Sequence, residues 1–248
     1  YANAETILLW GHNPTSTWLA QANAIARGRA NGAKMVVVDP RPTPLARQAD
    51  AWLRVRPGTD AALALGIIRR LIKTQRYDDE FVRAWTNGPL LVRSDTGLFL
   101  RARDVFAGSG SDSYVAWDEV AGGPVPFDPQ RAPSHATTQH LKLRGSVAVR
   151  VEASAAAVEC LPAFEMLARA AEPYDEETVQ SVTGVEPENL RAATELLIRG
   201  RRIAYHAWTG LGQHTNATQS EREVATLYAL SGSFDRIGGN RVGRGPFP

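Results

Sequence analysis

Residues 35–43 read MVVVDPRPT, and this stretch decides the fold class. Its first four residues are apolar and mostly β-branched, which is typical of a strand buried on both faces of a parallel sheet. The strand ends abruptly at Asp39 and Pro40, so a carboxylate lies at its carboxyl tip. Ligands of open α/β sheets bind outside the carboxyl ends of the strands. The stretch therefore predicts an α/β fold with a binding group at Asp39.

A second acidic residue follows at the start of a helix. Residues 56–60 read RPGTD, and the apolar run 61–72 comes directly after them. We expect Asp39 and Asp60 to point into one crevice, where two carboxylates suit the amide and amino edge of a purine or the hydroxyls of a ribose. Strand termination is the alternative for Asp39, but Arg41 favours binding because a guanidinium can bond phosphate. For Asp60 taken alone, helix capping is favoured.

The preceding segment completes a strand–helix–strand unit. Residues 6–10, TILLW, read as a buried strand, and Ser16 can cap a helix that runs to about residue 31. The crossover to the strand at 34–38 is expected to be right-handed. The first half is therefore predicted as a Rossmann-like parallel sheet with flanking helices. Its further elements are a helix at 45–49, a strand at 52–55 and a helix at 59–73.

From residue 90 the pattern changes to short alternating segments. They predict a small β-hairpin region, an irregular excursion or lid at 122–138, and later a return to helices. A strand at 203–208, a polar loop at 209–216 and a helix at 217–231 follow. We expect residues 1–150 to form one α/β domain with a hairpin insertion, and 151–248 to be part of a second α/β domain. The remaining strands are expected at 90–92, 98–100, 114–117 and 147–151, and helices at 164–170 and 190–197.

Composition narrows the class of protein. The chain has 248 residues, 44% hydrophobic and 22% charged, with a net charge of +2. Lys and Arg are scattered, so nucleic acid is not expected as a partner. No apolar stretch approaches the roughly eighteen residues of a membrane span, and no signal-peptide pattern opens the chain. Because a core strand starts at Thr6 without a lead-in, we expect a segment from inside a longer protein.

Cysteine usage excludes several kinds of site. Cys160 is the only cysteine, so this chain alone builds no disulfide and no cysteine-only iron–sulfur or zinc site. We expect its thiol to be an inert packing group. No catalytic triad, Walker motif or metal-ligand spacing is present, so neither catalytic nor metal-binding residues are predicted.

Two loops remain as candidates for ligand binding. The turn after the first strand has only Gly11, not the Gly-x-Gly-x-x-Gly of nicotinamide dehydrogenases. Asn13 would have to contribute its amide there, or Asn13 and Pro14 are merely a turn before a helix. His214 lies in a glycine-containing loop whose polar side chains suit a heterocycle, and its functional and structural interpretations stay balanced. His206, in an apolar strand, is expected to be a hydrogen-bonded core histidine.

Several motifs together resemble the dimethyl-sulfoxide-reductase family of molybdopterin oxidoreductases. The resemblance rests on WGHNP at 10–14, VDPR at 38–41 with Thr43, and RPGTDAAL at 56–63. It continues in the same order through nearly the whole chain. The later motifs are TGV at 183–185, Gly210 with QHTN at 213–216, LSG at 230–232 and RIGG at 236–239.

The resemblance implies a pair of molybdopterin guanine dinucleotides around one molybdenum or tungsten atom. It implies that this chain is an internal region that positions the cofactor, while an iron–sulfur cluster and the metal ligand are supplied elsewhere. Flanking domains of the same enzyme, and an electron-transfer subunit, are the implied partners. The implied cofactor-binding residues are Trp10, Gly11, Asn13, Pro14, Asp39, Pro40, Arg41 and Thr43 along the nucleotide, Gly58, Thr59 and Asp60 at the guanine end, and Thr209, Gly210, Gln213 and His214 near a pterin.

Three alternatives stay open at this point. The chain is either part of a redox enzyme or part of a hydratase or transhydroxylase of the same family. A third possibility is a non-catalytic module that keeps the fold and binds a nucleotide or a protein partner. The compartment, cytoplasmic or periplasmic, is not determined by the sequence.

Overall fold

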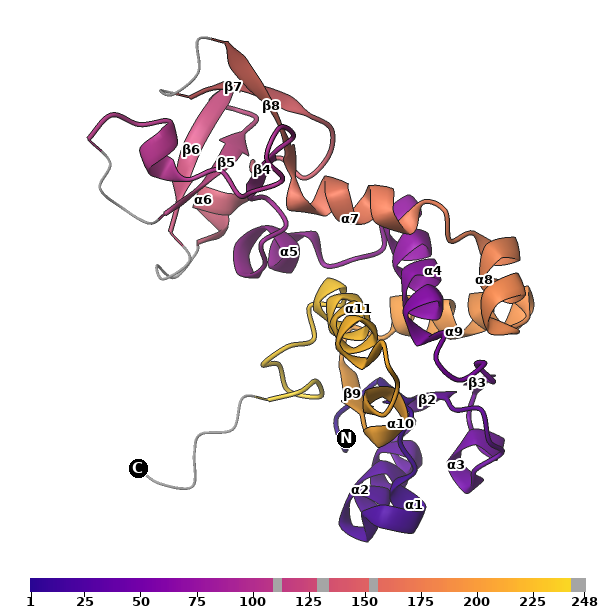
Figure 1. The fold of residues 1–248 in the computed structure, drawn as a ribbon. Helices are drawn as coiled ribbons and strands as arrows, with labels where there is room; N and C mark the ends of the chain where they lie inside the picture. Colours follow the sequence, from indigo (N-terminus) through magenta and orange to yellow (C-terminus); the bar gives the residue numbers. More distant parts are fainter. Residues whose placement is uncertain (109–112, 129–133, 152–155, 242–248) are drawn as a thin grey trace. The chain divides into compact units, whose positions relative to one another are not determined.

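A computed structural model of the chain describes residues 1–108, 113–128, 134–151 and 156–241 (Figure 1). Its contacts divide the chain into two compact units, residues 1–77 with 171–248 (unit 1) and residues 78–170 (unit 2). The boundary predicted at residue 150 differs from this division and falls inside unit 2. Within the described ranges, no helix has the length and apolar character needed to cross a bilayer.

Unit 1 is built on a four-stranded parallel sheet, as predicted. The strand order is β3-β2-β1-β9, so β1 lies in the middle between β2 and β9, which is the last strand of the described residues. Residues 203–207 therefore complete the first sheet, where a separate domain was expected. The strands are β1 (Thr6–Trp10), β2 (Lys34–Val38), β3 (Ala51–Leu53) and β9 (Ile203–Ala207).

Helices cover both faces of this sheet. Alternating residues of β1 separate the two layers: Leu9 packs with Ile25 of α2, whereas Leu8 lies among side chains of α4, α9 and α11. Figure 1 shows α2 and α11 on opposite sides of the sheet. The helices of unit 1 are α1 (Pro14–Thr17), α2 (Leu19–Ala30), α3 (Pro44–Arg47), α4 (Asp60–Lys73), α8 (Glu176–Thr183), α9 (Pro187–Arg199), α10 (Thr209–Gly212) and α11 (Ala217–Leu230).

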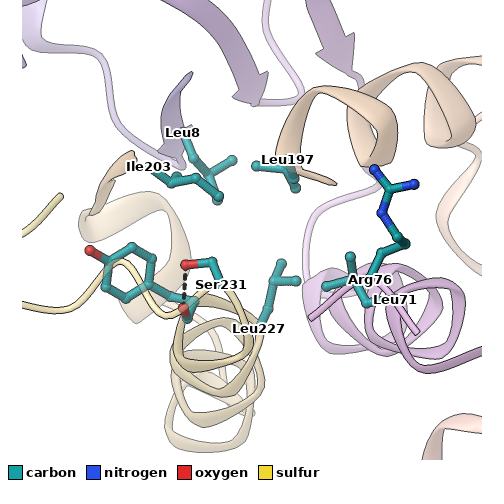
Figure 2. Close-up of a pocket in the computed structure, with 8 residues that line it drawn as sticks. Leu8, Leu71, Arg76, Leu197, Ile203, Leu227 and Ser231 are labelled. Atoms are coloured by element: carbon teal, nitrogen blue, oxygen red, sulfur yellow. Dashed lines mark hydrogen bonds between the residues drawn. The ribbon is translucent and has the colours of Figure 1, made fainter. Parts of the chain in front are cut away.

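A small cavity of about 20 Å³ lies in the layer between the sheet and the helices α4, α9 and α11 (Figure 2). Its volume is that of about one water molecule. The cavity is near the amino end of β9, away from the carboxyl ends of the strands, so it belongs to the core. Its lining residues are Leu8, Leu71, Arg76, Leu197, Ile203, Leu227, Tyr228 and Ser231.

The outer edge of β9 is covered by side chains from the end of unit 1. Asn240 donates from Nδ2 to the Tyr205 carbonyl and accepts the Tyr205 N–H at Oδ1, both at 2.9 Å. Ser233 Oγ accepts the Ile203 N–H at 3.1 Å. These side chains replace a neighbouring strand, which protects the edge against pairing with another chain.

Unit 2 contains two small antiparallel sheets. One has the strand order β4-β8-β7 and the other pairs β5 with β6. The predicted hairpin is present as the bridge between Val92 and Phe99. The elements are α5 (Asp79–Trp85), β4 (Leu91–Arg93), η1 (Ala102–Asp104), β5 (Tyr114–Asp118), β6 (Gly123–Phe127), α6 (His135–Thr138), β7 (Val147–Arg150), β8 (Ala157–Pro162) and α7 (Ala163–Ala171).

Two local predictions were wrong, and one strand was missed. The strand β6 occupies part of the stretch expected to be irregular, because its two prolines lie on a strand with one partner, where prolines are tolerated. Residues 129–133 of that stretch lie outside the described residues. The strand β8 was not predicted. The helix expected from Ser16 is divided at Trp18 into α1 and α2.

Cys160 lies on β8 and is fully buried. Burial raises the pKa of its thiol to about 11. The thiol therefore stays protonated at neutral pH and is a poor nucleophile, as expected for a packing residue.

A buried carboxylate ties α7 to a turn of unit 2. Glu165 is 8% exposed and accepts hydrogen bonds from the side chains of Arg144 (2.7 Å) and Arg169 (2.9 Å) and from the Gly145 N–H (3.1 Å). Burial by itself would raise the pKa of this carboxyl, but the three donors outweigh it and lower the pKa to about 2.

The loops that leave β1 and β9 touch through two glycines. Gly210 N–H donates to the Gly11 carbonyl at 3.1 Å, and Trp208 N–H donates to the Trp10 carbonyl at 3.2 Å. A Cβ on Gly210 would lie 2.6 Å from the Gly11 oxygen, and Gly11 itself has a φ of +57°. Side chains at either position would force the two strand ends apart.

We predict that Gly210→Ala destabilises unit 1 by about 2 kcal/mol or more, because its methyl group meets backbone that cannot move aside. Urea unfolding followed by tryptophan fluorescence measures the change. Gly212→Ala is the matched control, since the nearest atom to its Cβ is Glu221 Oε1 at 3.9 Å. Equal losses in the two variants would contradict the close approach.

We predict that Glu165→Gln destabilises unit 2 by on the order of 2 kcal/mol at pH 7. Because the folded-state pKa is depressed, the stabilisation is present above the ordinary value of 4.5 and is lost as the pH falls toward 2. Thermal unfolding at pH 7 and pH 3 should therefore show a smaller difference in acid. Glu119→Gln, which removes an exposed pair with Lys142, should change stability by less than about 1 kcal/mol at either pH.

Candidate functional site

The carboxyl ends of β1 and β9 form a topological switch point in unit 1. From β1 the chain passes through α2 to β2 on one side, whereas β9 pairs with β1 on the other side. Loops that diverge at such a point leave a crevice, which is where open α/β sheets bind ligands. The loop after β1, the loop after β9 and the start of α4 meet here.

Trp10 and Asp60 join β1 to the first turn of α4. The Trp10 ring is fully buried, and its Nε1–H donates to Asp60 Oδ1 at 2.7 Å. Asp60 is 5% exposed. Burial raises the pKa of the Asp60 carboxyl, although the hydrogen bond from Trp10 and the charge of His214 act in the opposite direction. The backbone N–H groups of Asp60 and Gly58 also lower this pKa, but burial outweighs all of these contributions. The ionised carboxylate would therefore gain from a ligand that donates further hydrogen bonds.

The loop after β9 lies against the residues that precede α4. Asn216 donates from Nδ2 to the Gly58 carbonyl at 3.1 Å. His214 Nδ1 is 3.8 Å from the position that a Cβ on Gly58 would take. The predicted residues Gly58, Asp60 and His214 are thus brought together, next to the contact between Gly11 and Gly210.

Asp39 fixes the turn that follows β2. It is 4% exposed, and its Oδ1 accepts the Arg41 N–H at 2.8 Å. Trp52 Nε1–H donates to the Asp39 carbonyl at 2.8 Å. The Arg41 side chain is 75% exposed, with Nε 3.9 Å from Asp39 Oδ1. A carboxylate and a largely solvated guanidinium therefore lie at the same strand end, and Pro40 between them is half-buried.

Other predicted residues make local contacts. Asn13 bonds Ser16 and Thr15 through its amide, so its side chain organises the turn before α1. Thr43 accepts the Ala46 N–H and thereby caps α3. Pro14 starts α1, Thr59 donates to the Arg56 carbonyl, and the side chains of Thr209 and Gln213 are exposed at the ends of α10.

Sequence reasoning missed a group of aromatic rings at the same strand ends. His12 and His206 have ring centroids 4.4 Å apart, and Trp18 and Trp208 lie beside them. His206 Nε2 is buried without a hydrogen-bond partner among the described residues, so the expectation of a hydrogen-bonded core histidine was wrong. The parallel register of Leu9 with His206 would have revealed the pair, but it requires knowing that β9 joins β1.

Within the residues that the structure describes, no three or more His, Cys, Asp or Glu side chains form a group suited to a metal ion. Every side chain of the candidate site belongs to unit 1. The site offers a ligand the carboxylates of Asp39 and Asp60 as hydrogen-bond acceptors and the exposed guanidinium of Arg41. The backbones of Gly11 and Gly210 touch beside them.

Comparison with known proteins adds to this geometry. The profile of the molybdopterin oxidoreductase family matches residues 1–243. The chain is 26% identical to dimethylsulfide dehydrogenase subunit alpha of Rhodovulum sulfidophilum, over 95% of this chain and 26% of the relative. It is 31% identical to chlorate reductase subunit alpha of Ideonella dechloratans, over 76% of this chain and 20% of the relative.

The fold has a counterpart among solved structures. Acetylene hydratase from Pelobacter acetylenicus superposes with a TM-score of 0.61 and 23% identity, over 94% of this chain and 22% of that one. The chain thus spans between 20% and 26% of the length of these three proteins. Because the family profile covers nearly all of the sequence, the chain belongs to the molybdopterin oxidoreductase family.

Proposed function

We propose that unit 1 binds the guanine dinucleotide form of a molybdopterin and orients it for an oxidoreductase. Membership of the family implies a molybdopterin cofactor with molybdenum or tungsten. The observation that carries the nucleotide part is Asp60, a buried carboxylate at a helix start for which Trp10 is the one side-chain donor among the described residues and whose pKa is raised by burial. Guanine presents N–H donors at N1 and N2 that a carboxylate accepts as a pair, and adenine lacks this pattern.

We assign each residue of the site to one part of the ligand. Asp60 accepts from the guanine edge, and Asp39 accepts from ribose hydroxyls or the base. Arg41 supplies a solvent-exposed cation for the phosphates. Gly11 allows backbone to lie close to the ligand. Thr209, Gln213 and His214 offer donors and acceptors on the side of the loop after β9, where the pterin would lie.

This fit rests on the donor and acceptor set of the crevice. The two glycines keep the loops after β1 and β9 free of side chains at their contact, and the amino end of α4 adds a partial positive charge. The bound molybdopterin supplies the electron or oxygen-atom transfer chemistry. The residues of unit 1 bind it, hold its direction and leave the reacting end to other parts of the protein.

The range of relatives supports a positioning role. A protein named as a dehydrogenase and one named as a reductase, acting on different substrates, are both similar to this segment. A segment found in both is expected to have a role that both require, and binding of the molybdopterin cofactor is such a role. We further propose that flanking domains supply the metal ligand and an iron–sulfur cluster, and that an electron-transfer subunit completes the enzyme, since both relatives are named as subunits.

We predict that the chain, produced in a host that makes the pterin cofactor, carries molybdenum or tungsten together with guanine nucleotide. Elemental analysis measures the metal, and chromatography after acid release identifies the nucleotide. With the purified, cofactor-free chain, GDP should bind at least about tenfold more tightly than ADP by calorimetry, because adenine offers the buried carboxylate no pair of N–H donors. Equal affinity for the two nucleotides would exclude guanine recognition by Asp60.

We predict that Asp60→Asn weakens GDP binding by about tenfold or more while leaving unit 1 as stable or more stable at pH 7. The folded-state pKa of Asp60 is raised, so its ionised form costs stability, and this cost disappears as the pH falls below the ordinary value of 3.8. The gain in urea unfolding should therefore shrink between pH 7 and pH 3. Glu188→Gln, whose carboxylate is 85% exposed on α9, should change neither quantity. A variant that is less stable at pH 7 and still binds GDP would contradict the assignment.

A further inference from the structure

His12 and His206 form an imidazole pair at the switch point, in which His12 is buried and His206 is half-buried. Their rings are tilted by 36° with centroids 4.4 Å apart. His12 is 2% exposed, and its Nε2 is 2.8 Å from Gln21 Oε1. His12 Nδ1 and His206 Nε2 are both buried, and neither has a hydrogen-bond partner among the described residues. Unpartnered polar atoms in a buried place cost free energy, so this arrangement needs a reason.

Among the described residues, no carboxylate contributes to the pKa shift of His12 or His206. The ring of Trp18 lies 6.4 Å from that of His12, the ring of Trp208 lies 5.6 Å from that of His206, and Gln21 is the side-chain hydrogen-bond partner. Within the described residues, these neighbours from α2 and the loop after β9 bring no carboxylate to the pair. The charge that acts on His206 is that of His12.

Both imidazoles are therefore neutral at pH 7 when no ligand is bound. Burial lowers the pKa of His12, opposed by its bond to Gln21. Burial also lowers the pKa of His206, and a charge on His12 lowers it further. With Nε2–H donating to Gln21, the neutral His12 has only a lone pair at Nδ1 and cannot donate there.

The amino end of α2, which is close to the pair, also carries a positive partial charge that no acidic side chain in its first turn offsets. This helix of 12 residues begins at Leu19, and its N-cap Trp18 makes no side-chain capping bond. No acidic residue lies in its first turn, where Gln21 contacts His12. The partial positive charge of the helix end thus adds to the cost of protonating the pair, until an anion arrives.

We propose that the imidazole pair takes up one proton when a phosphate group binds beside the loop after β1, so that nucleotide binding at this site tightens as the pH falls. The inference rests on the proposed function, because the phosphate belongs to the nucleotide held by Asp60. Protonation turns an unpartnered ring nitrogen into a donor, and the phosphate supplies the missing negative charge. No bond other than that of the transferred proton is formed or broken.

Linkage gives the size of the effect. Between the pKa of the pair in the free protein and its higher value in the complex, the dissociation constant falls up to about tenfold for each pH unit of acidification. In the free protein the pKa values of both imidazoles lie below the ordinary 6.5 of histidine. The affinity therefore depends on pH near neutrality only if ligand binding raises the pKa of the pair above about 7. The dependence is then a property of the complex.

Calorimetry of GDP binding to the 248-residue chain between pH 6 and pH 8, in two buffers of different ionisation enthalpy, tests the proposal. We expect uptake approaching one proton per GDP. His12→Gln and His206→Asn should each still bind GDP, with an uptake about one proton lower than that of the unmodified chain, so that the ionisation of the ligand's own phosphate cancels in the comparison. His140→Gln, an exposed histidine of unit 2, is the control and should behave as the unmodified chain. The proposal would be overturned if the unmodified chain bound GDP without taking up a proton. It would also be overturned if each single variant took up as much as the unmodified chain.

A second measurement separates this proposal from guanine recognition. Nitrogen chemical shifts of the two imidazoles, followed by NMR at pH 7 while inorganic pyrophosphate is added, report protonation directly and require no base. A change to the imidazolium pattern supports the proposal even where GDP and ADP bind equally, which refutes only the assignment of Asp60. Rings that stay neutral at saturating pyrophosphate overturn it, whatever the nucleotide preference.

Discussion

The contact between the backbones of Gly11 and Gly210 is the constraint on which the rest of unit 1 depends. It lets β9 pair with β1 up to their carboxyl ends, so the loops that follow start from one point. The start of α4 then reaches both loops through Trp10 and Asn216. A side chain at the contact would widen the switch point, and the groups proposed to hold the ligand would no longer share a crevice.

The site around this contact is electrostatically unfavourable by itself. Burial raises the pKa of Asp60 and lowers that of His12, so acid and base are each displaced toward their neutral forms. Glu165 in unit 2 is the opposite case, since three donors surround it and its pKa falls. The donors around Glu165 outweigh its burial, whereas at the switch point burial outweighs the partners present, and a ligand can supply further ones.

Local patterns in the sequence were sufficient for much of the fold. The apolar run ending at Asp39, and Asp60 at a helix start, placed strands, helices and polar tips where the structure has them. The pairing of distant strands could not be predicted from the sequence, because nothing in residues 203–207 indicates which strand they pair with. The pair of His12 and His206 depends on that pairing and was missed for this reason. The strand β6 was missed because Pro124 and Pro126 have the composition of a loop.

Unit 2 is inserted between the two halves of unit 1, and this affects the order in which the chain can fold. The unit formed by β1, β2 and β3 leaves one edge of β1 open until β9 has been synthesised, after all of unit 2. The edge of β9 in turn stays open until Asn240 has left the ribosome. During translation the sheet therefore stays incomplete, with a strand edge available for wrong pairing, while all of unit 2 is being made.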